Sequence, residues 1–434
     1  MVGQTVIGGG RFQLFVAFMT FPHFSQRPPQ FIDTLPHRGA MCGLTLTISS
    51  LAQSAEPSNA ALVRSLHAAN SARGPNSQGL YTRRLDTPAG DVLVSLSASV
   101  LGLRGEGVTA QPLVGKRGVL GWNGQVFDGL DIGPRDNDTR AIFEKLEAGE
   151  SPAEVLQEIE GPFAFIYLSF ETNVVHFALD PLSRRSLLIH VPEPGSSCQT
   201  LILTSSRSAE GRRQGVPMRA LNGGEGGSVD LSKLSRGDCV GIDFEQAVHL
   251  VSQPVRTTCL DWESVRLTKQ HRVATVNTSE APSTSLGAEP ALAECNTFVK
   301  NLLGSVRRRV ENIPPPLPGT STARVALLFS GGVDCTLLAS LVHQCVPIDE
   351  PIELINVAFE GPQKEVHRSA RQQPPKIATY NVPDRVSGRE AVMELQASCP
   401  GRHFQFVEVN VTIEESRSHR QSIVDVMYPS NTGV

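Results

Sequence analysis

An apolar run followed by a glycine loop constrains the fold of this chain more than any other feature. Residues 325–329 are all apolar, residues 330–334 contain two glycines, and helical spacing of apolar residues resumes over 336–343. An uninterrupted apolar strand suits a parallel sheet that is covered on both faces. Free N–H groups at the start of the helix favour an anion, although glycine turns between a strand and a helix are also common. The sequence therefore predicts a parallel α/β sheet with a candidate phosphate site.

Short alternating runs dominate the chain from Cys42 onward. Residues 42–50 and 92–100 alternate between apolar and polar, as half-buried strands do. Further strands are predicted at 118–122, where the strand is expected to stop at Asn123-Gly124, and at 163–167 and 174–178. Helices are predicted from an N-cap at Asn59, over 139–148, and from a capping box at Ser151 to about residue 159. We therefore expect one α+β domain over residues 42 to about 250.

The rest of the chain divides into an extension, a linker and a second domain. Residues 1–41 lack periodicity apart from an apolar run at 12–21. A signal peptide is one interpretation of that run, but a nearly uncharged flank and the lack of a cleavage site favour a poorly structured extension. Residues 251–294 are predicted to be a linker, rich in Ser, Thr, Glu and Ala. Residues 295–434 open with a predicted helix whose apolar residues are Phe298, Leu302, Val306 and Val310.

Composition limits the classes of function. The 434 residues are 40% hydrophobic and 19% charged with a formal net charge of −4, which gives no basic surface for nucleic acid or acidic membranes. The eight cysteines form no C-x-x-C pair or zinc-type cluster, which favours a reducing compartment without a structural metal. The longest apolar run is about half of the roughly 20 residues that a membrane span needs. We therefore expect a cytoplasmic protein with small-molecule substrates, no membrane or nucleic-acid partner and no tightly bound cofactor.

Four short segments are candidates for a catalytic site. They are Cys42, Arg73-Gly74-Pro75-Asn76-Ser77, Trp122-Asn123-Gly124-Gln125 and Asn137-Asp138-Thr139. Taken singly they are weak signals, because a lone cysteine in a strand is usually a small core residue and an Asn-Gly is usually a turn.

In this order the four segments resemble the class II glutamine amidotransferases. The resemblance implies that Cys42 is the first residue of the mature chain and attacks the glutamine amide, with its own α-amine as the base. It implies that Asn123 and the Gly124 N–H form the oxyanion hole. It further implies that Arg73 binds the α-carboxylate of glutamine and that Asp138 binds the α-ammonium.

Two departures from the amidotransferase pattern affect these roles. Gln125 stands where the family has a glutamate, which removes a charged partner of the substrate. Cys42 follows 41 residues in the sequence, and a peptide-bonded nitrogen cannot act as a base. Initiation at Met41 and removal of that methionine would leave Cys42 first.

The loop of residues 330–334 resembles the pyrophosphate-binding loop of ATP pyrophosphatases. The resemblance implies that Ser330, Gly331 and Gly332 hold the pyrophosphate end of ATP and that Asp334 helps to organise magnesium. Cys335 stands where the family usually has serine. From Met41 to about Met427, apart from the linker, the whole chain resembles the glutamine-dependent asparagine synthetases. The segments that carry the resemblance include residues 101–105, 161–167, 184–187, 351–359, 382–389 and 406–411.

The family implies an N-terminal-nucleophile sandwich followed by an α/β domain that is Rossmann-like, of the adenine nucleotide alpha hydrolase type. We expect this second half to be incomplete, because a synthetase domain continues past Val434. The implied substrates are glutamine, aspartate and ATP with magnesium, and the implied product is asparagine. A glutaminase alone and a noncatalytic interaction protein remain the alternatives, and we expect no asparagine from this chain by itself. The sequence predicts no oligomeric state.

Overall fold

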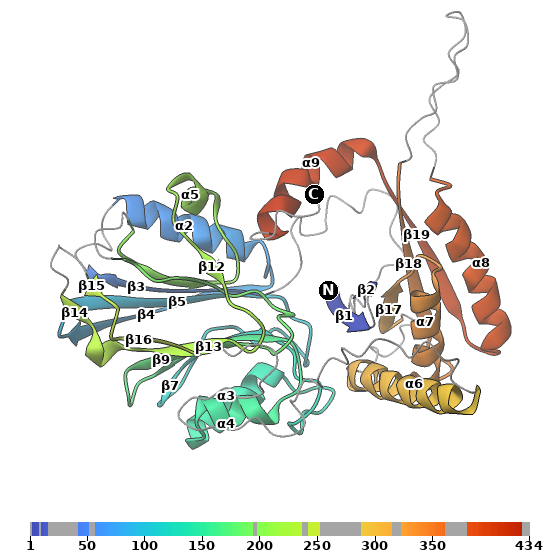
Figure 1. The fold of residues 1–434 in the computed structure, drawn as a ribbon, viewed down its shortest axis with the longest axis horizontal. Coiled ribbons are helices and arrows are strands. Elements are labelled where there is room, and N and C mark those ends of the chain that lie inside the picture. Colours follow the sequence, from blue (N-terminus) through green and yellow to red (C-terminus); the bar gives the residue numbers. More distant parts are fainter. Residues whose placement is uncertain are drawn as a thin grey trace, which may run out of the picture. The chain divides into compact units, whose positions relative to one another are not determined.

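Figure 1 shows the fold of the chain, a computed structural model that describes residues 2–7, 10–15, 42–51, 57–193, 198–236, 242–251, 288–314, 323–360 and 380–427. The fold is mixed α/β with several sheets. The chain divides into two compact units, Asp33–Val276 with Gln421–Val434, and Met1–Ile32 with Asn277–Arg420. We call the described residues 42–251 the amino-terminal unit and residues 288–420 the carboxy-terminal unit, and treat each by itself.

The first sheet of the amino-terminal unit has six strands in the order β12-β10-β11-β3-β5-β4, all antiparallel. Its strands are β3 (Gly43–Ser50), β4 (Ser77–Thr87), β5 (Gly90–Val100), β10 (Leu188–His190), β11 (Leu201–Thr204) and β12 (Arg219–Ala220). The predicted strands at 42–50 and 92–100 are confirmed as β3 and β5, whereas β4 was not predicted. Pairing of β3 with both β5 and β11 places the chain that follows Cys42 in the interior of the sheet.

The second sheet is also antiparallel and follows the order β16-β13-β9-β8-β7-β6. Its strands are β6 (Leu113–Val114), β7 (Gly118–Gly124), β8 (Phe163–Ser169), β9 (Val174–Leu179), β13 (Gly226–Asp230) and β16 (Val248–Val251). The predicted pair at 163–167 and 174–178 is confirmed. The expectation that β7 stops before Asn123-Gly124 is wrong, because both residues pair with β8 in the ladder.

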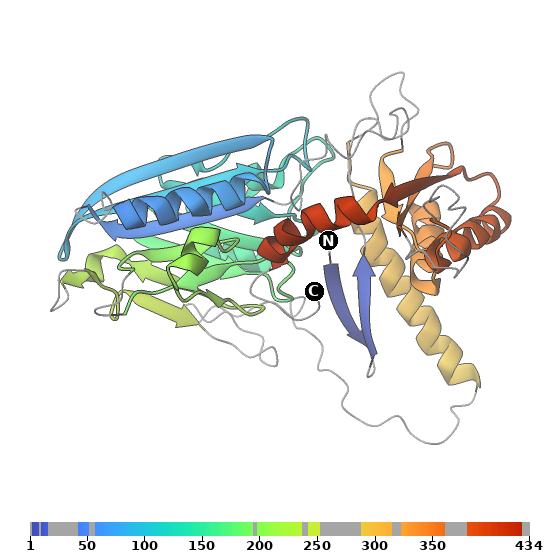
Figure 2. The same ribbon diagram turned by 90° about the horizontal axis from the view of Figure 1, so that it is seen from above.

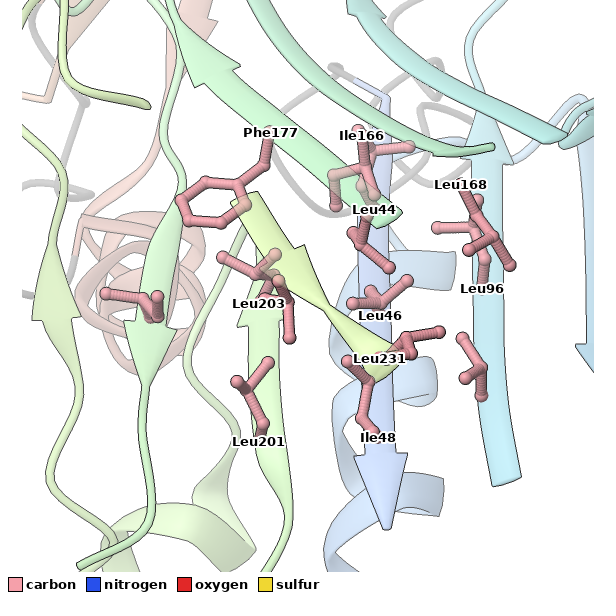
Figure 3. Packing of buried hydrophobic residues seen from close by; sticks show 14 of the residues in the cluster. Leu44, Leu46, Ile48, Leu96, Ile166, Leu168, Phe177, Leu201, Leu203 and Leu231 are labelled. Atoms are coloured by element: carbon pink, nitrogen blue, oxygen red, sulfur yellow. The ribbon is translucent and has the colours of Figure 1, made fainter. Parts of the chain in front are cut away.

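A continuous apolar core lies between the two sheets of this unit. Figure 3 shows Leu44, Leu46 and Ile48 of β3 packing with leucines of β5 and β11 and with apolar residues of β8 and β9. The alternation of β3 explains this arrangement, since successive side chains of a strand point to opposite faces. Thr45 and Thr47 of β3 are also buried, on the opposite face from Leu44 and Leu46.

Helices cover the outer faces of both sheets (Figures 1 and 2). Helix α2 (Pro57–Ser71) packs on β3 and β5 and contacts α5 (Ala209–Arg213), whereas α3 (Asp138–Ala148) and α4 (Pro152–Glu158) belong with the second sheet. The capping box at Ser151 is confirmed, because Ser151 and Glu154 exchange both hydrogen bonds. The prediction of Asn59 as an N-cap is wrong, because α2 begins at Pro57 and Asn59 lies within it.

Short elements complete the part of the chain before residue 252. They are the 3-10 turn η2 (Leu231–Lys233) and the strands β14 (Ser235–Arg236) and β15 (Ile242–Asp243), which pair with each other. Upstream, β1 (Val2–Ile7) and β2 (Gly10–Phe15) pair antiparallel, a hairpin that the sequence analysis did not predict. Of the linker predicted at 251–294, Val251 is the last residue of β16 and residues 252–287 lie outside the described residues.

The carboxy-terminal unit contains a parallel sheet in the order β17-β18-β19. Its elements are α6 (Ala288–Val310), β17 (Val325–Leu328), α7 (Val333–Cys345), β18 (Ile352–Phe359), α8 (Pro383–Ser398), β19 (Phe404–Val411) and α9 (Ile413–Met427). The last of these helices, α9, continues past the end of the unit at residue 420. The predicted parallel sheet and the helix after the glycine loop are thereby confirmed, and α6 begins within the stretch predicted as linker. Apolar residues of α6, α7 and α8 pack together against the three strands. Among the described residues no helix is long and apolar enough to cross a bilayer.

Candidate functional site

Cys42 lies immediately before β3, where its thiol sulphur accepts a hydrogen bond from the Leu101 N–H at 3.3 Å. Helix α2 holds β3 and the neighbouring β11, since Asn70 Nδ2 donates to Thr45 Oγ1 of β3 at 2.7 Å and to Thr204 Oγ1 of β11 at 2.9 Å. Gly43 permits this close approach, because a Cβ atom at Gly43 would lie 2.7 Å from the Cβ of Asn70. The cysteine backbone is thus fixed by a buried polar cluster on the helix side of the sheet.

Arg73 follows the end of α2 and is 1% exposed. Its Nε donates to the carbonyl oxygen of Cys42 at 3.2 Å, and its Nη2 is buried without a hydrogen-bond partner among the described residues. The next turn is tied to the end of β5, because the Gly102 N–H donates to Asn76 Oδ1 at 3.0 Å. The structure therefore brings Arg73 to Cys42 with one donor group unused.

Asp138 is the first residue of α3 and is 3% exposed. Its carboxylate accepts the N–H groups of Val126 at 3.1 Å and Thr139 at 2.9 Å, so α3 is tied to the chain that leaves β7. Arg104 crosses the same region, because it donates to the Val126 carbonyl while its own carbonyl accepts from Asn137 Nδ2. These contacts join the connection that leads from β7 to α3 with the one that follows β5.

The end of β7 supplies the residues predicted for an oxyanion hole. Asn123 is 1% exposed, and its Nδ2 is buried without a partner in the described part of the chain. Gly124 is the last residue of β7, and Gln125 follows it with its N–H donating to the Pro162 carbonyl at 2.9 Å. The Gln125 side chain is partly exposed.

Five ionisable side chains, those of Cys42, Arg73, Arg104, Asp138 and Arg185, lie close enough at this site to shift the pKa values of their neighbours. Burial raises the pKa of the Cys42 thiol; the Leu101 N–H, Arg185 and Arg73 oppose that rise, and Asp138 adds to it. Burial lowers the pKa of Arg73 to about 10, and Arg185 acts in the same direction. Burial also raises the pKa of Asp138, against the effect of Arg104. The thiol is therefore largely protonated near neutral pH and needs a base to become a nucleophile.

The sequence analysis missed several residues that surround Cys42, Arg73 and Asp138. Arg185 is buried and influences both Cys42 and Asp138, yet it entered the sequence analysis only as part of the family resemblance. Asn70, Leu101 and Arg104 also hold the site and were assigned no role. An arginine pair after the end of β9, at Arg184 and Arg185, was the one sequence signal for a charged site there.

The glycine loop of the carboxy-terminal unit lies between β17 and α7, as predicted. Gly332 is the N-cap of α7 and offers no side-chain cap, which leaves the first N–H groups of the helix for other partners. Cys335 Sγ donates to the Gly332 carbonyl at 3.2 Å and lies 3.7 Å from Ser330 Oγ. Ser330, Gly332 and Asp334 are exposed. Asp334 has no metal cluster around it, because no group of three or more His, Cys, Asp or Glu in the described segments could hold a metal ion.

Comparisons with known proteins identify the relatives of the chain. No model of a protein family matches it. The proteins named asparagine synthetase domain-containing protein 1 from Bos taurus and Homo sapiens are 29% identical to it, over 90% of this chain and 71% of theirs. A Drosophila melanogaster protein, also named as asparagine synthetase domain-containing, is 27% identical over 83% of this chain and 66% of its own. A solved glutamine phosphoribosylpyrophosphate amidotransferase from B. subtilis, complexed with ADP and GMP, has 12% identity and a TM-score of 0.35, over 89% of this chain and 93% of that one; this is too low to establish a shared fold. The chain is thus a homologue of the asparagine synthetase domain-containing proteins.

Proposed function

We propose that the amino-terminal unit is an N-terminal-nucleophile glutaminase that hydrolyses glutamine at Cys42. The observation that carries this proposal is a pair of buried donors, Arg73 Nη2 and Asn123 Nδ2, without partners among the described residues. A buried donor without a partner costs about 1–3 kcal/mol. A ligand with a carboxylate and a carbonyl oxygen would satisfy both donors, and glutamine has this combination.

The proposed reaction assigns one role to each residue. The Cys42 sulphur attacks the side-chain amide carbon of glutamine, and its proton passes to the α-amine of Cys42 as first residue. Asn123 Nδ2 and the Gly124 N–H stabilise the oxyanion that forms. When this intermediate collapses, the C–N bond breaks and ammonia leaves with the proton from the amine. Water then hydrolyses the thioester to glutamate and restores the thiol.

Binding of the substrate falls to charged groups around the nucleophile. Arg73 Nη2 is proposed to donate to the α-carboxylate, and Asp138 to accept from the α-ammonium. Asp138 already accepts two backbone N–H groups, which stabilise its ionised form. Gln125 is proposed to lie at the same ammonium with a neutral amide, which weakens that contact.

For the carboxy-terminal unit we propose ATP binding with magnesium at Ser330, Gly331, Gly332 and Asp334, and aspartate as the acceptor of the ammonia. The exposed loop and the uncapped start of α7 support a phosphate site. Magnesium is proposed to arrive with the nucleotide phosphates, because Asp334 is a single carboxylate. Cys335 offers a weaker hydrogen bond donor than serine at this position.

Expression from Met41 tests the glutaminase. Removal of the methionine leaves Cys42 first, and the protein should then release ammonia from glutamine. Cys42→Ala should abolish the release, and Cys42→Ser should be nearly as damaging because a hydroxyl ionises far less than a thiol. Cys295→Ala, which changes an exposed cysteine of α6, is the matched control and should keep full activity.

Calorimetric titration with ATP and magnesium tests the second unit. Weak magnesium-dependent binding that Asp334→Ala removes supports the ATP site. Ammonia release without ATP binding would reduce the function to a glutaminase. A folded protein that shows neither would be an interaction protein that has kept the fold.

A further inference from the structure

The glycine loop of the carboxy-terminal unit contacts α8 at Ser387, near the start of the helix. Ser387 Oγ donates to the Ser330 carbonyl at 2.8 Å and also approaches the Pro383 carbonyl at 3.0 Å. Gly331 has a φ of +84°, and a Cβ atom there would lie 2.3 Å from the carbonyl carbon of Ser387. The back of the loop is therefore in direct contact with α8.

Asn356 of β18 links the start of the glycine loop to α8 through hydrogen bonds to both. It is 1% exposed, and its Nδ2 donates to the Phe329 carbonyl at 2.8 Å and to the Asp384 carbonyl at 2.9 Å. Both hydrogens of the amide are thus used, one on each side of the contact. Phe329 immediately precedes the loop, so Asn356 fixes where the loop leaves the sheet.

Arg385 fixes Asn356 in turn. Its guanidinium is 1% exposed, and Nε donates to Asn356 Oδ1 at 2.6 Å. The same side chain donates to Glu408 Oε2 at 2.7 Å and to the Val409 carbonyl at 2.9 Å, both on β19. The orientation of the asparagine amide is set by this charged donor, because only its oxygen can accept from Arg385.

The contacts of this network lie behind the loop, while its front is exposed at Ser330, Gly332 and Asp334. A cradle of N–H groups binds an anion best when the backbone is held in place before the ligand arrives. We propose that Asn356, Arg385 and Ser387 are positioning residues that hold the loop in the shape that binds nucleotide phosphates. This inference rests on the ATP site of the proposed function and adds the residues of α8 and β18 to it.

Ser387 offers a mild test with a matched control on the same helix. The hydroxyls of Ser387 and Ser398 each lie within hydrogen-bond distance of the backbone carbonyl four residues earlier in α8. Only the Ser387 hydroxyl also donates to the glycine loop. Ser387→Ala should weaken binding of ATP with magnesium about 2- to 10-fold, the range of one net hydrogen bond. Ser387→Thr, which keeps the hydroxyl, should restore binding, and Ser398→Ala should leave it unchanged.

Titration calorimetry of the unchanged protein and of Ser387→Ala, Ser387→Thr and Ser398→Ala measures the affinity for ATP with magnesium. Thermal unfolding checks that Ser387→Ala and Ser398→Ala are equally stable. Hydrogen exchange of peptides covering residues 325–338 provides a readout that needs no ATP. The Phe329 and Thr336 N–H groups flank the loop and donate to Ile355 and Gly332. Exchange in these peptides should be faster in Ser387→Ala than in Ser398→Ala.

The outcomes separate this inference from the function on which it rests. Normal ATP binding in Ser387→Ala, with loss of binding in Asp334→Ala, would overturn the positioning role and leave the ATP site standing. Absence of ATP binding in the unchanged protein would remove the ATP site, and exchange would then decide. Faster exchange in Ser387→Ala than in Ser398→Ala would support the conclusion that Ser387 holds the loop in place, and equal exchange in the two variants would overturn it.

Discussion

Replacement of Arg73 by methionine should separate substrate binding from stability in the amino-terminal unit. Methionine fills a similar volume without charge, so it removes the Nε contact to the Cys42 carbonyl and the unused Nη2 donor together. Because Arg73 is proposed to bind the α-carboxylate, glutamine should bind far more weakly. The stability of the fold should change little.

The stability estimate follows from two opposing contributions. The pKa of Arg73 falls from 12.5 to about 10, so a charged guanidinium costs the folded state roughly 3 kcal/mol. The cost is present in full at neutral pH, where both states are protonated, and is relieved only as the pH rises through about 10. The Nε hydrogen bond, with a charged donor, returns about 1.5–3 kcal/mol. We therefore expect the free energy of unfolding to change by less than about 2 kcal/mol.

Activity should respond much more strongly than stability. Loss of a charge-assisted contact of about 1.5–3 kcal/mol should lower kcat/KM for glutamine roughly 10- to 150-fold. Ammonia release from the protein expressed from Met41 measures this ratio, and chemical denaturation measures the stability. Arg64→Met, on the exposed side of α2, is the control and should change neither quantity. Destabilisation beyond about 3 kcal/mol with an unchanged kcat/KM would show that Arg73 is a structural anchor and refute the reasoning.

Three further predictions concern single positions. Gln125→Glu should lower the KM for glutamine about 10-fold in the ammonia assay by restoring a charged contact, whereas the exposed Gln78→Glu should not. Burial lowers the pKa of His176 to about 4, so the free energy of unfolding should fall by up to roughly 3 kcal/mol as the pH drops from 6.5 to 4. Denaturation curves of His176→Gln should lack that loss. Those of His249→Gln, a change at an exposed histidine, should retain it. Gly331→Ala should cost at least about 1–3 kcal/mol in thermal unfolding, because its positive φ strains an alanine and the added Cβ would overlap the Ser387 backbone, while Gly332→Ala, at a φ of −71°, should cost little.

The parts of the fold that could be predicted are those with a local cause. Alternation located β3 and β5 because each has one face against the core, and the capping box at Ser151 located α4 because both of its bonds lie within four residues. By contrast β4 was missed. Its sequence is rich in polar and charged residues, and along its length half-buried positions alternate with exposed ones. Only its pairing with β5 in the folded sheet specifies it.

Boundaries failed where tertiary contacts overrode local signals. Asn123-Gly124 reads as a turn, but β7 continues through it because the two residues pair with β8, opposite Ala164 and Phe163. Asn59 reads as an N-cap, yet α2 starts earlier and Asn59 is buried inside it. In both cases a residue with a strong turn or cap preference serves another purpose in the packed structure.

The two candidate sites share a construction that explains which of their residues sequence could find. In each, the groups proposed to touch substrate lie in short contiguous motifs, since a loop or strand end must present several of them at once. The residues that hold those motifs come from distant segments. Asn70 holds β3 through Thr45 and the neighbouring β11 through Thr204, and Asn356 holds the glycine loop through Phe329. A supporting asparagine has no motif of its own, because its Nδ2 donates to backbone carbonyls and hydroxyls that any sequence can supply. Such residues become visible only when the chain is folded, and their buried, fully used amides make them the places where a small substitution should loosen a site without touching its substrate.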